Sequence, residues 1–169
     1  MEITLKSVKI NKAMSDETTC FSATVYVRTP NDDPRALANP KYAGVRIGTV
    51  TNRGHGGSNE YRWTNADAGR ALERWANDQT VIIPACEFME EFELTFDKLD
   101  HFIDIALDAF ETAQWFKRKC KTKTLFRLKE DRDPDAWRIV NRPYTPLVMA
   151  LLVKHYGKDI AEVANETRV

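Results

Sequence analysis

Three glycines lie within four residues of this 169-residue chain, in the sequence GHGG at 54–57. Glycine readily adopts the positive φ angles that other residues avoid, so the backbone is expected to turn sharply here. The alternating residues 45–51 before the glycines and the extended segment 61–63 after them are typical of β-strands. Glycines placed between two strands predict a turn that joins an antiparallel pair.

Further periodic segments place this turn in a mixed fold. Alternation predicts a strand around Ile3 and Leu5, and strands at about 20–27, 124–128 and 137–140. The short apolar run at 80–86 is broken by Pro84, which predicts a buried extended segment or an edge strand. Apolar residues at three-and-four spacing predict helices at about 65–76 and 97–119, and Pro146 and Gly157 mark the two ends of a third. We therefore expect a single α+β domain over 1–169, an antiparallel sheet of about five to six strands packed with about three α-helices.

Two segments are expected to lie outside the packed core. Residues 29–43 hold three prolines among several Asn and Asp residues, which predicts an exposed Pro-rich loop. Residues 158–169 follow the last helix and are expected to fray. The inward face of that last helix is expected to consist of Leu147, Ala150 and Leu151.

The sequence also indicates the cellular compartment in which the protein is expected. The first ten residues contain no continuous apolar segment of the kind found in signal peptides, and no run reaches the eighteen apolar residues that a membrane helix needs. The three cysteines show no CxxC spacing, which fits a reducing environment. We therefore expect a soluble cytoplasmic protein without a membrane partner.

Charge is balanced overall, with 25 Lys and Arg against 25 Asp and Glu, but it is unevenly distributed. Residues 87–111 hold nine acids and one base, and residues 117–127 hold six bases and no acid. Such stretches are either solvated faces or surfaces that bind a partner of opposite charge. The candidate partner-binding residues are Asp97, Asp100, Asp104, Asp108, Glu111, Lys117, Lys119, Lys121, Lys123 and Arg127.

The glycine segment is also a candidate ligand site, because successive backbone N–H groups in such a loop can surround an anion. The candidate ligand-binding residues are Asn52, Arg53, Gly54, His55, Gly56, Gly57 and Asn59. A turn alone explains the same glycines, and the spacing matches neither the Walker loop nor GxGxxG. His55 has only Glu60 nearby to orient it as a base, so we assign no catalytic residue and favour binding over catalysis.

No metal or cofactor site is assigned. His101 lies between Asp97 and Asp104 at helical spacing, which would permit a divalent ion, but one histidine on a solvated acidic face is the simpler explanation.

The segment GVRIGTVTNRGHGGSNEYRW, following ETTCFSATVYV, resembles a group of small uncharacterised bacteriophage and prophage proteins. These proteins share a strand pair, a strand leading into N-x-G-H-G-G, a helix and a late basic strand similar to FKRKCKTKTLFRLK here. The Pro-rich segment at 31–40 departs from their pattern, in which a short turn joins the strands. The resemblance implies a viral or mobile-element origin and the cytoplasm of an infected bacterium.

Small phage accessory proteins of this kind often act by binding, so the resemblance implies three hypotheses. In the first, the protein inhibits a host antiviral system, such as CRISPR interference, by docking its charged faces on a host defence protein. In the second, the GHGG loop binds or cleaves a nucleotide or phosphate ligand. In the third, residues 117–127 bind nucleic acid, with adjacent aromatic residues for stacking. A homodimer is compatible with each.

Overall fold

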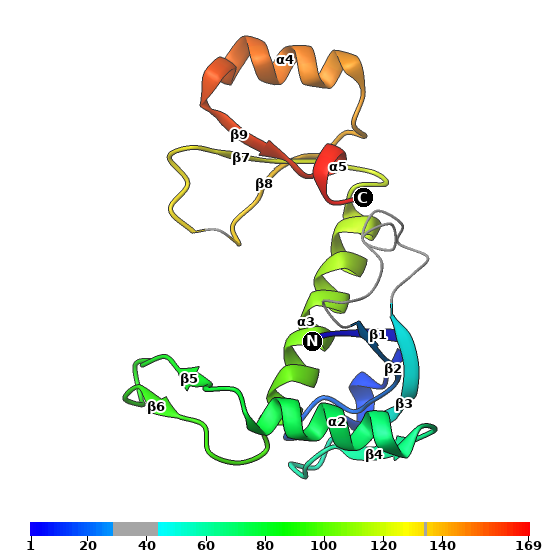
Figure 1. Ribbon diagram of the computed structural model, residues 1–169. Coiled ribbons are helices and arrows are strands. Elements are labelled where there is room, and N and C mark those ends of the chain that lie inside the picture. Colours follow the sequence, from blue (N-terminus) through cyan, green and yellow to red (C-terminus); the bar gives the residue numbers. More distant parts are fainter. Residues whose placement is uncertain (29–43, 134) are drawn as a thin grey trace. The chain divides into compact units, whose positions relative to one another are not determined.

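The computed structural model describes residues 1–28, 44–133 and 135–169 (Figure 1), so the expected Pro-rich loop at 29–43 lies outside the described residues. The chain divides into two compact units, residues 1–107 and 108–169, and each is described by itself. Both contain helices and antiparallel strands, which confirms the α+β class. That residues 1–169 form a single domain stays a prediction.

Unit 1 is built on a four-stranded sheet of order β1-β2-β3-β4, in which every neighbouring pair is antiparallel. The strands are β1 (Glu2–Ile10), β2 (Phe21–Arg28), β3 (Val45–Asn52) and β4 (Glu60–Trp63). The short 3-10 helix η1 (Lys12–Met14) lies between β1 and β2. The antiparallel β3–β4 pair confirms that the GHGG segment joins two antiparallel strands.

One face of this sheet forms the core with two helices, α2 (Ala66–Asn77) and the first half of α3 (Lys98–Lys119). Val25 and Val50 from the sheet, Leu72 from α2 and Ile103 from α3 are fully buried in one cluster. Each such side chain stabilises the fold by about 1.5–3 kcal/mol. The Asn65 side chain accepts a hydrogen bond from the Ala68 amide and so begins α2.

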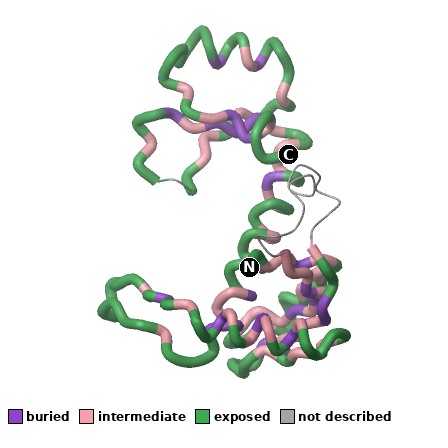
Figure 2. The backbone as a smooth tube through the Cα atoms, in the orientation of Figure 1, coloured by how far each residue is buried: buried purple, intermediate pink, exposed green. Residues whose placement is uncertain are grey.

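Between these helices the chain forms a short ribbon of β5 (Ile82–Ile83) and β6 (Phe92–Glu93). The Cys86 amide donates to the Met89 carbonyl at 2.8 Å and closes a tight turn at its tip. Residues 82–96 are called the arm below. Figure 2 shows that most of the arm is exposed.

Unit 2 contains a three-stranded antiparallel sheet of order β8-β7-β9. Its elements after α3 are β7 (Thr124–Leu128), β8 (Arg138–Val140), α4 (Pro146–Tyr156), the 3-10 helix η2 (Gly157–Asp159), β9 (Ile160–Val163) and α5 (Ala164–Thr167). The Thr145 hydroxyl accepts from the Val148 amide at 3.2 Å, and Pro146 occupies the first turn of α4. The described residues thus hold nine strands and four α-helices; β5 lies within the segment expected at 80–86, and the short β6 and β9 are the strands that no expected segment covers.

The expected inward face of α4 is wrong. Leu147 is 69% exposed and Leu151 is also exposed, whereas Val148 and Leu152 are buried against Phe126 and Val163. The sequence PLVMALLV is apolar on every side of the helix, so periodicity cannot show which side meets the sheet.

The expected fraying of residues 158–169 is also wrong. This segment forms β9 and α5, with Val163 and Ala164 buried. The Asn165 side chain donates to the carbonyls of Cys120 and Lys123 and accepts from the Leu125 amide at 2.9 Å. Burial and these three hydrogen bonds fix the end of the chain, where composition alone suggested disorder.

Candidate functional site

The glycine loop between β3 and β4 folds back onto an earlier turn of the chain. Gly54 and Gly56 have φ angles of +84° and +77°, the left-handed region that favours glycine. The Gly54 carbonyl accepts three backbone N–H groups, from Asp16 at 3.0 Å, Glu17 at 3.1 Å and Thr18 at 3.4 Å. Residues 16–18 therefore form a nest of amides, and the glycine loop supplies the oxygen that fills it.

The amides of the loop are also engaged with the chain itself. The Gly54 N–H donates to the Asn52 side-chain oxygen at 2.8 Å, and the Gly56 N–H donates to the Thr18 hydroxyl at 3.4 Å. The Asn52 amide group donates to the Gly57 carbonyl at 3.0 Å and to the Asn59 side chain at 3.1 Å. The expected ligand residues Asn52, Gly54, Gly56, Gly57 and Asn59 thus come together as one internal network.

Asp100 extends this network from α3. Its carboxylate accepts the Asn59 amide at 2.9 Å and the hydroxyl of Tyr61. Burial raises the pKa of Tyr61 above its usual range, and the hydrogen bond and negative charge of Asp100 raise it further. Asp100, expected to bind a partner, therefore holds the end of the glycine loop in place.

Arg53 and His55 of the loop lie outside the network. His55 is exposed, and Arg53 forms an ion pair at 2.9 Å with Glu60, both side chains being largely exposed. Glu60 was the expected orienting group for His55. In the structure its ion-pair partner is Arg53.

The remaining charged residues divide between surface and interior. Asp97, Asp104, Asp108, Lys117 and Lys121 are exposed, while Glu111, Lys119 and Lys123 are half-buried. Lys119 lies over the Trp115 ring at 5.9 Å. Arg127 pairs with Glu162 at 3.0 Å and lies 5.0 Å from the centre of the Trp137 ring, so it contributes to the packing of unit 2.

Glu162 is the centre of a cluster that sequence reasoning missed. It accepts from the Arg168 guanidinium and from the Thr167 hydroxyl, each at 2.7 Å. The Arg168 hydrogen bond, with that of Thr167 and the charges of Arg168 and Arg127, lowers the pKa of Glu162 to about 2 against the cost of its burial. The cluster ties β9 to α5 and β7.

The arm carries a second set of residues that the sequence analysis did not single out. Phe88 at its tip is 90% exposed and Phe96 at its base is 70% exposed, and Met89 and Phe92 are exposed between them. Acids alternate with these side chains: Glu87, Glu90, Glu91 and Glu93. Alternation of acidic and large apolar residues is the signal that identifies such a segment from sequence.

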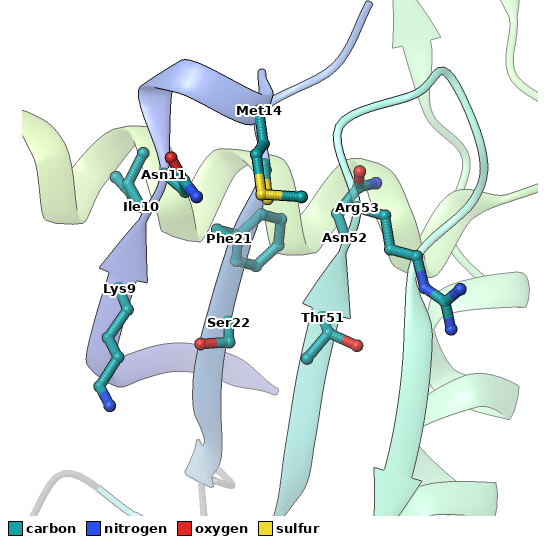
Figure 3. A pocket seen from close by; sticks show the side chains of 10 residues that line it. Lys9, Ile10, Asn11, Met14, Phe21, Ser22, Thr51, Asn52 and Arg53 are labelled. Carbon is teal, nitrogen blue, oxygen red and sulfur yellow. The ribbon is translucent and has the colours of Figure 1, made fainter. Parts of the chain in front are cut away.

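A cavity of about 310 Å³ lies where η1 crosses the ends of β1, β2 and β3. Met14 and Phe21 meet at its centre, and Lys9 and Arg53 lie on opposite sides (Figure 3). Ser22, Thr51 and Asn52 add polar groups to the lining. An apolar floor with cations and hydroxyls at the rim suits a small anionic or aromatic ligand. No local sequence motif marks this site, since its residues come from four separate elements.

Within the described residues, no group of His, Cys, Asp and Glu side chains is arranged to hold a metal ion. None of the helices in those same ranges is long and apolar enough to cross a membrane. Comparison of the chain with family models, with curated proteins and with solved structures finds no match.

Proposed function

We propose that this protein acts by binding another protein, with the arm as its docking element, and that it inhibits a host antiviral system such as CRISPR interference. The observation that carries the proposal is the exposure of Phe88 and Phe96 among glutamates on the arm. The phage role rests on the resemblance of the GHGG segment alone.

The arm has the chemistry of a protein contact surface. Its exposed aromatic residues belong to no hydrophobic cluster of the described residues, so they do not contribute to the stability of a packed core. Large aromatic side chains at the centre of an interface supply much of its binding free energy. The surrounding glutamates form no ion pair within the described part of the chain and favour a basic partner.

The test compares three proteins in bacteria that carry a CRISPR defence against a plaque-forming phage. The unaltered protein should restore plaques, and Phe88→Ser combined with Phe96→Ser should lower the plaque count at least about tenfold, as expected when hot-spot contacts of about 2 kcal/mol are lost. Leu147→Ser on α4 is the matched control, because it removes an apolar residue outside the arm that is as exposed as Phe96.

Binding is then measured directly with the purified defence complex by co-elution in gel filtration. Both variants should unfold at the same urea concentration as the unaltered protein, because none of the three side chains is part of a core cluster. Inhibition that survives the arm substitutions, or is lost equally in the control, would contradict the proposal.

A further inference from the structure

The sheet of unit 1 has an outward face that its core does not use. Because side chains alternate along a strand, the core residues Leu5, Val25 and Val50 leave their neighbours on the opposite side. The strand register aligns these neighbours in rows, one being Lys6, Thr24, Thr49 and Arg62, and the next Lys9, Ser22, Thr51 and Glu60. The outward face is defined here as Lys6, Lys9, Ser22, Thr24, Tyr26, Arg46, Thr49, Thr51, Glu60 and Arg62, and none of these residues is buried.

This face is positively charged. Its four cations are Lys6, Lys9, Arg46 and Arg62, and none of them forms an ion pair with a residue that the structure describes. Glu60 on this face pairs with Arg53, and Glu2 at its margin pairs with Arg28. A polyanion would therefore meet four positive charges that no acid of the described residues pairs.

Between the cations lie groups that bind phosphate and bases. Ser22, Thr24, Thr49 and Thr51 occupy the two central strands, and hydroxyls of this kind donate hydrogen bonds to phosphate oxygens. Tyr26 lies beside Arg46 in the register and carries the Lys6 amine 4.7 Å from its ring centre. An aromatic ring beside cations is the combination that proteins use to stack single-stranded bases.

The cavity under η1 adjoins this face at the ends of β1, β2 and β3, and its lining also includes Ile10, Phe21 and Asn52 from the neighbouring row that faces the core. Lys9, Ser22 and Thr51 belong both to the outward face and to the cavity lining, and Figure 3 shows them on three adjacent strands. Beyond them, Met14 and Phe21 provide an apolar floor. A base at the end of a bound strand would find there an apolar surface with hydroxyl and amide groups around it.

We propose that the outward face binds single-stranded nucleic acid, with its phosphates on Lys6, Lys9, Arg46 and Arg62 and a base in the cavity. A duplex is read by an α-helix or a two-stranded β-ribbon that enters a groove, and the broad face of a four-stranded sheet does not enter one. A membrane surface or an acidic protein would need large apolar residues at the centre of the contact, and here that centre carries hydroxyls. The surface is separate from the arm and from residues 117–127.

The probe is a fluorescently labelled 20-nucleotide oligothymidylate, with an RNA of equal length in parallel, titrated with the full chain and followed by anisotropy. Four phosphate contacts predict a slope of about −2.8 for log affinity against log salt, or an affinity loss of about 50-fold between about 50 and about 200 mM salt. In Lys6→Gln combined with Arg62→Gln, two contacts remain and the loss over the same range should fall to about 7-fold. The charge-conserving Lys6→Arg with Arg62→Lys should restore the steeper dependence.

The matched control is Lys117→Gln combined with Lys121→Gln, which removes the same charge from exposed positions of the other basic segment. It should leave affinity and salt dependence unchanged. A larger effect of this control than of the Lys6 and Arg62 pair would overturn the proposal in favour of residues 117–127. Absence of saturable binding at low salt, or displacement of the oligonucleotide by an equal concentration of polyglutamate, would also overturn it.

Discussion

Replacing each of the three glycines of the GHGG segment by alanine should change the free energy of unfolding by very different amounts, and these differences test the loop geometry directly. Alanine at Gly54 would adopt a φ of +84°, which costs about 1–2 kcal/mol for a residue with a Cβ. That Cβ would also lie 2.0 Å from the Met14 carbonyl oxygen, a backbone atom that cannot rotate away. Moving the turn apart would weaken the three hydrogen bonds to the Gly54 carbonyl, each contributing about 1 kcal/mol. We expect Gly54→Ala to cost about 3–5 kcal/mol by these contributions.

The other two positions complete a graded series. Gly56→Ala has the same backbone strain, but its Cβ would meet the end of the flexible Glu17 side chain, which can swing away, so about 1–2 kcal/mol is expected. Gly57→Ala meets nothing within 4 Å and has no positive φ, so a gain of about 0.4–1 kcal/mol is expected from reduced freedom of the unfolded chain.

Urea unfolding followed by circular dichroism measures the series, with the change in free energy taken at constant m value. Hydrogen exchange of the Asp16 and Glu17 amides gives a local readout, because both donate to the Gly54 carbonyl and should exchange faster in Gly54→Ala. Equal destabilisation at Gly54 and Gly57, or unaltered exchange of those amides in Gly54→Ala, would refute the reasoning.

Three further predictions concern α3, α4 and β9. Asp100→Asn removes the charged acceptor of the Tyr61 hydroxyl and the Asn59 amide, so it should lower the free energy of unfolding by about 1–3 kcal/mol. Asp108 is exposed, so Asp108→Asn should change it by less than about 0.5 kcal/mol, and urea titrations of the two variants measure the difference. Leu152→Ala should cost about 2–4 kcal/mol and Leu151→Ala less than about 1 kcal/mol in thermal unfolding, because only the former is buried; the reverse order would restore the inward face expected from the sequence. Folding lowers the pKa of Glu162 from 4.5 to about 2, so the contribution of Glu162 to the free energy of unfolding is complete above pH 4.5 and is lost as the pH falls towards 2. Glu162→Gln should therefore make stability depend less on pH in this range of an acid-unfolding curve, and an unchanged curve would argue against the cluster.

The strands and the two long helices could be predicted because their periodicity is local. The alternation in β2 and β3 and the three-and-four spacing in α3 each record which side of one element is buried. For α4 the same method failed, since apolar residues surround the helix and only the sheet beneath it selects Val148 and Leu152. The structure of the last residues could not be predicted for a related reason, because the groups that hold Asn165 lie forty or more residues earlier.

The glycine loop was predicted as a turn, but its contacts were not. The sequence indicates that Gly54 needs a positive φ, and the structure confirms it. What fills the space around the loop comes from residues 16–18 and from Asp100, about forty residues away on either side. Local composition suggested amides open to an anion, whereas the fold supplies acceptors for the Gly54 and Gly56 amides from its own side chains.

The distribution of charge shows most clearly why a linear count is a poor guide to binding surfaces. Asp100 and Asp108 belong to one acidic stretch, yet the first accepts hydrogen bonds inside unit 1 and the second is exposed, because burial depends on neighbours that the stretch itself does not contain. Conversely, Lys6, Lys9, Arg46 and Arg62 are spread over more than fifty residues, so no single short segment of the sequence contains all four. Antiparallel pairing of β1 to β4 brings them onto one face, on which the acid Glu60 is paired with Arg53. A chain with 25 charges of each sign can therefore present a basic face and an acidic arm within one unit, because strand pairing brings together charged residues that lie on different strands and far apart in the sequence.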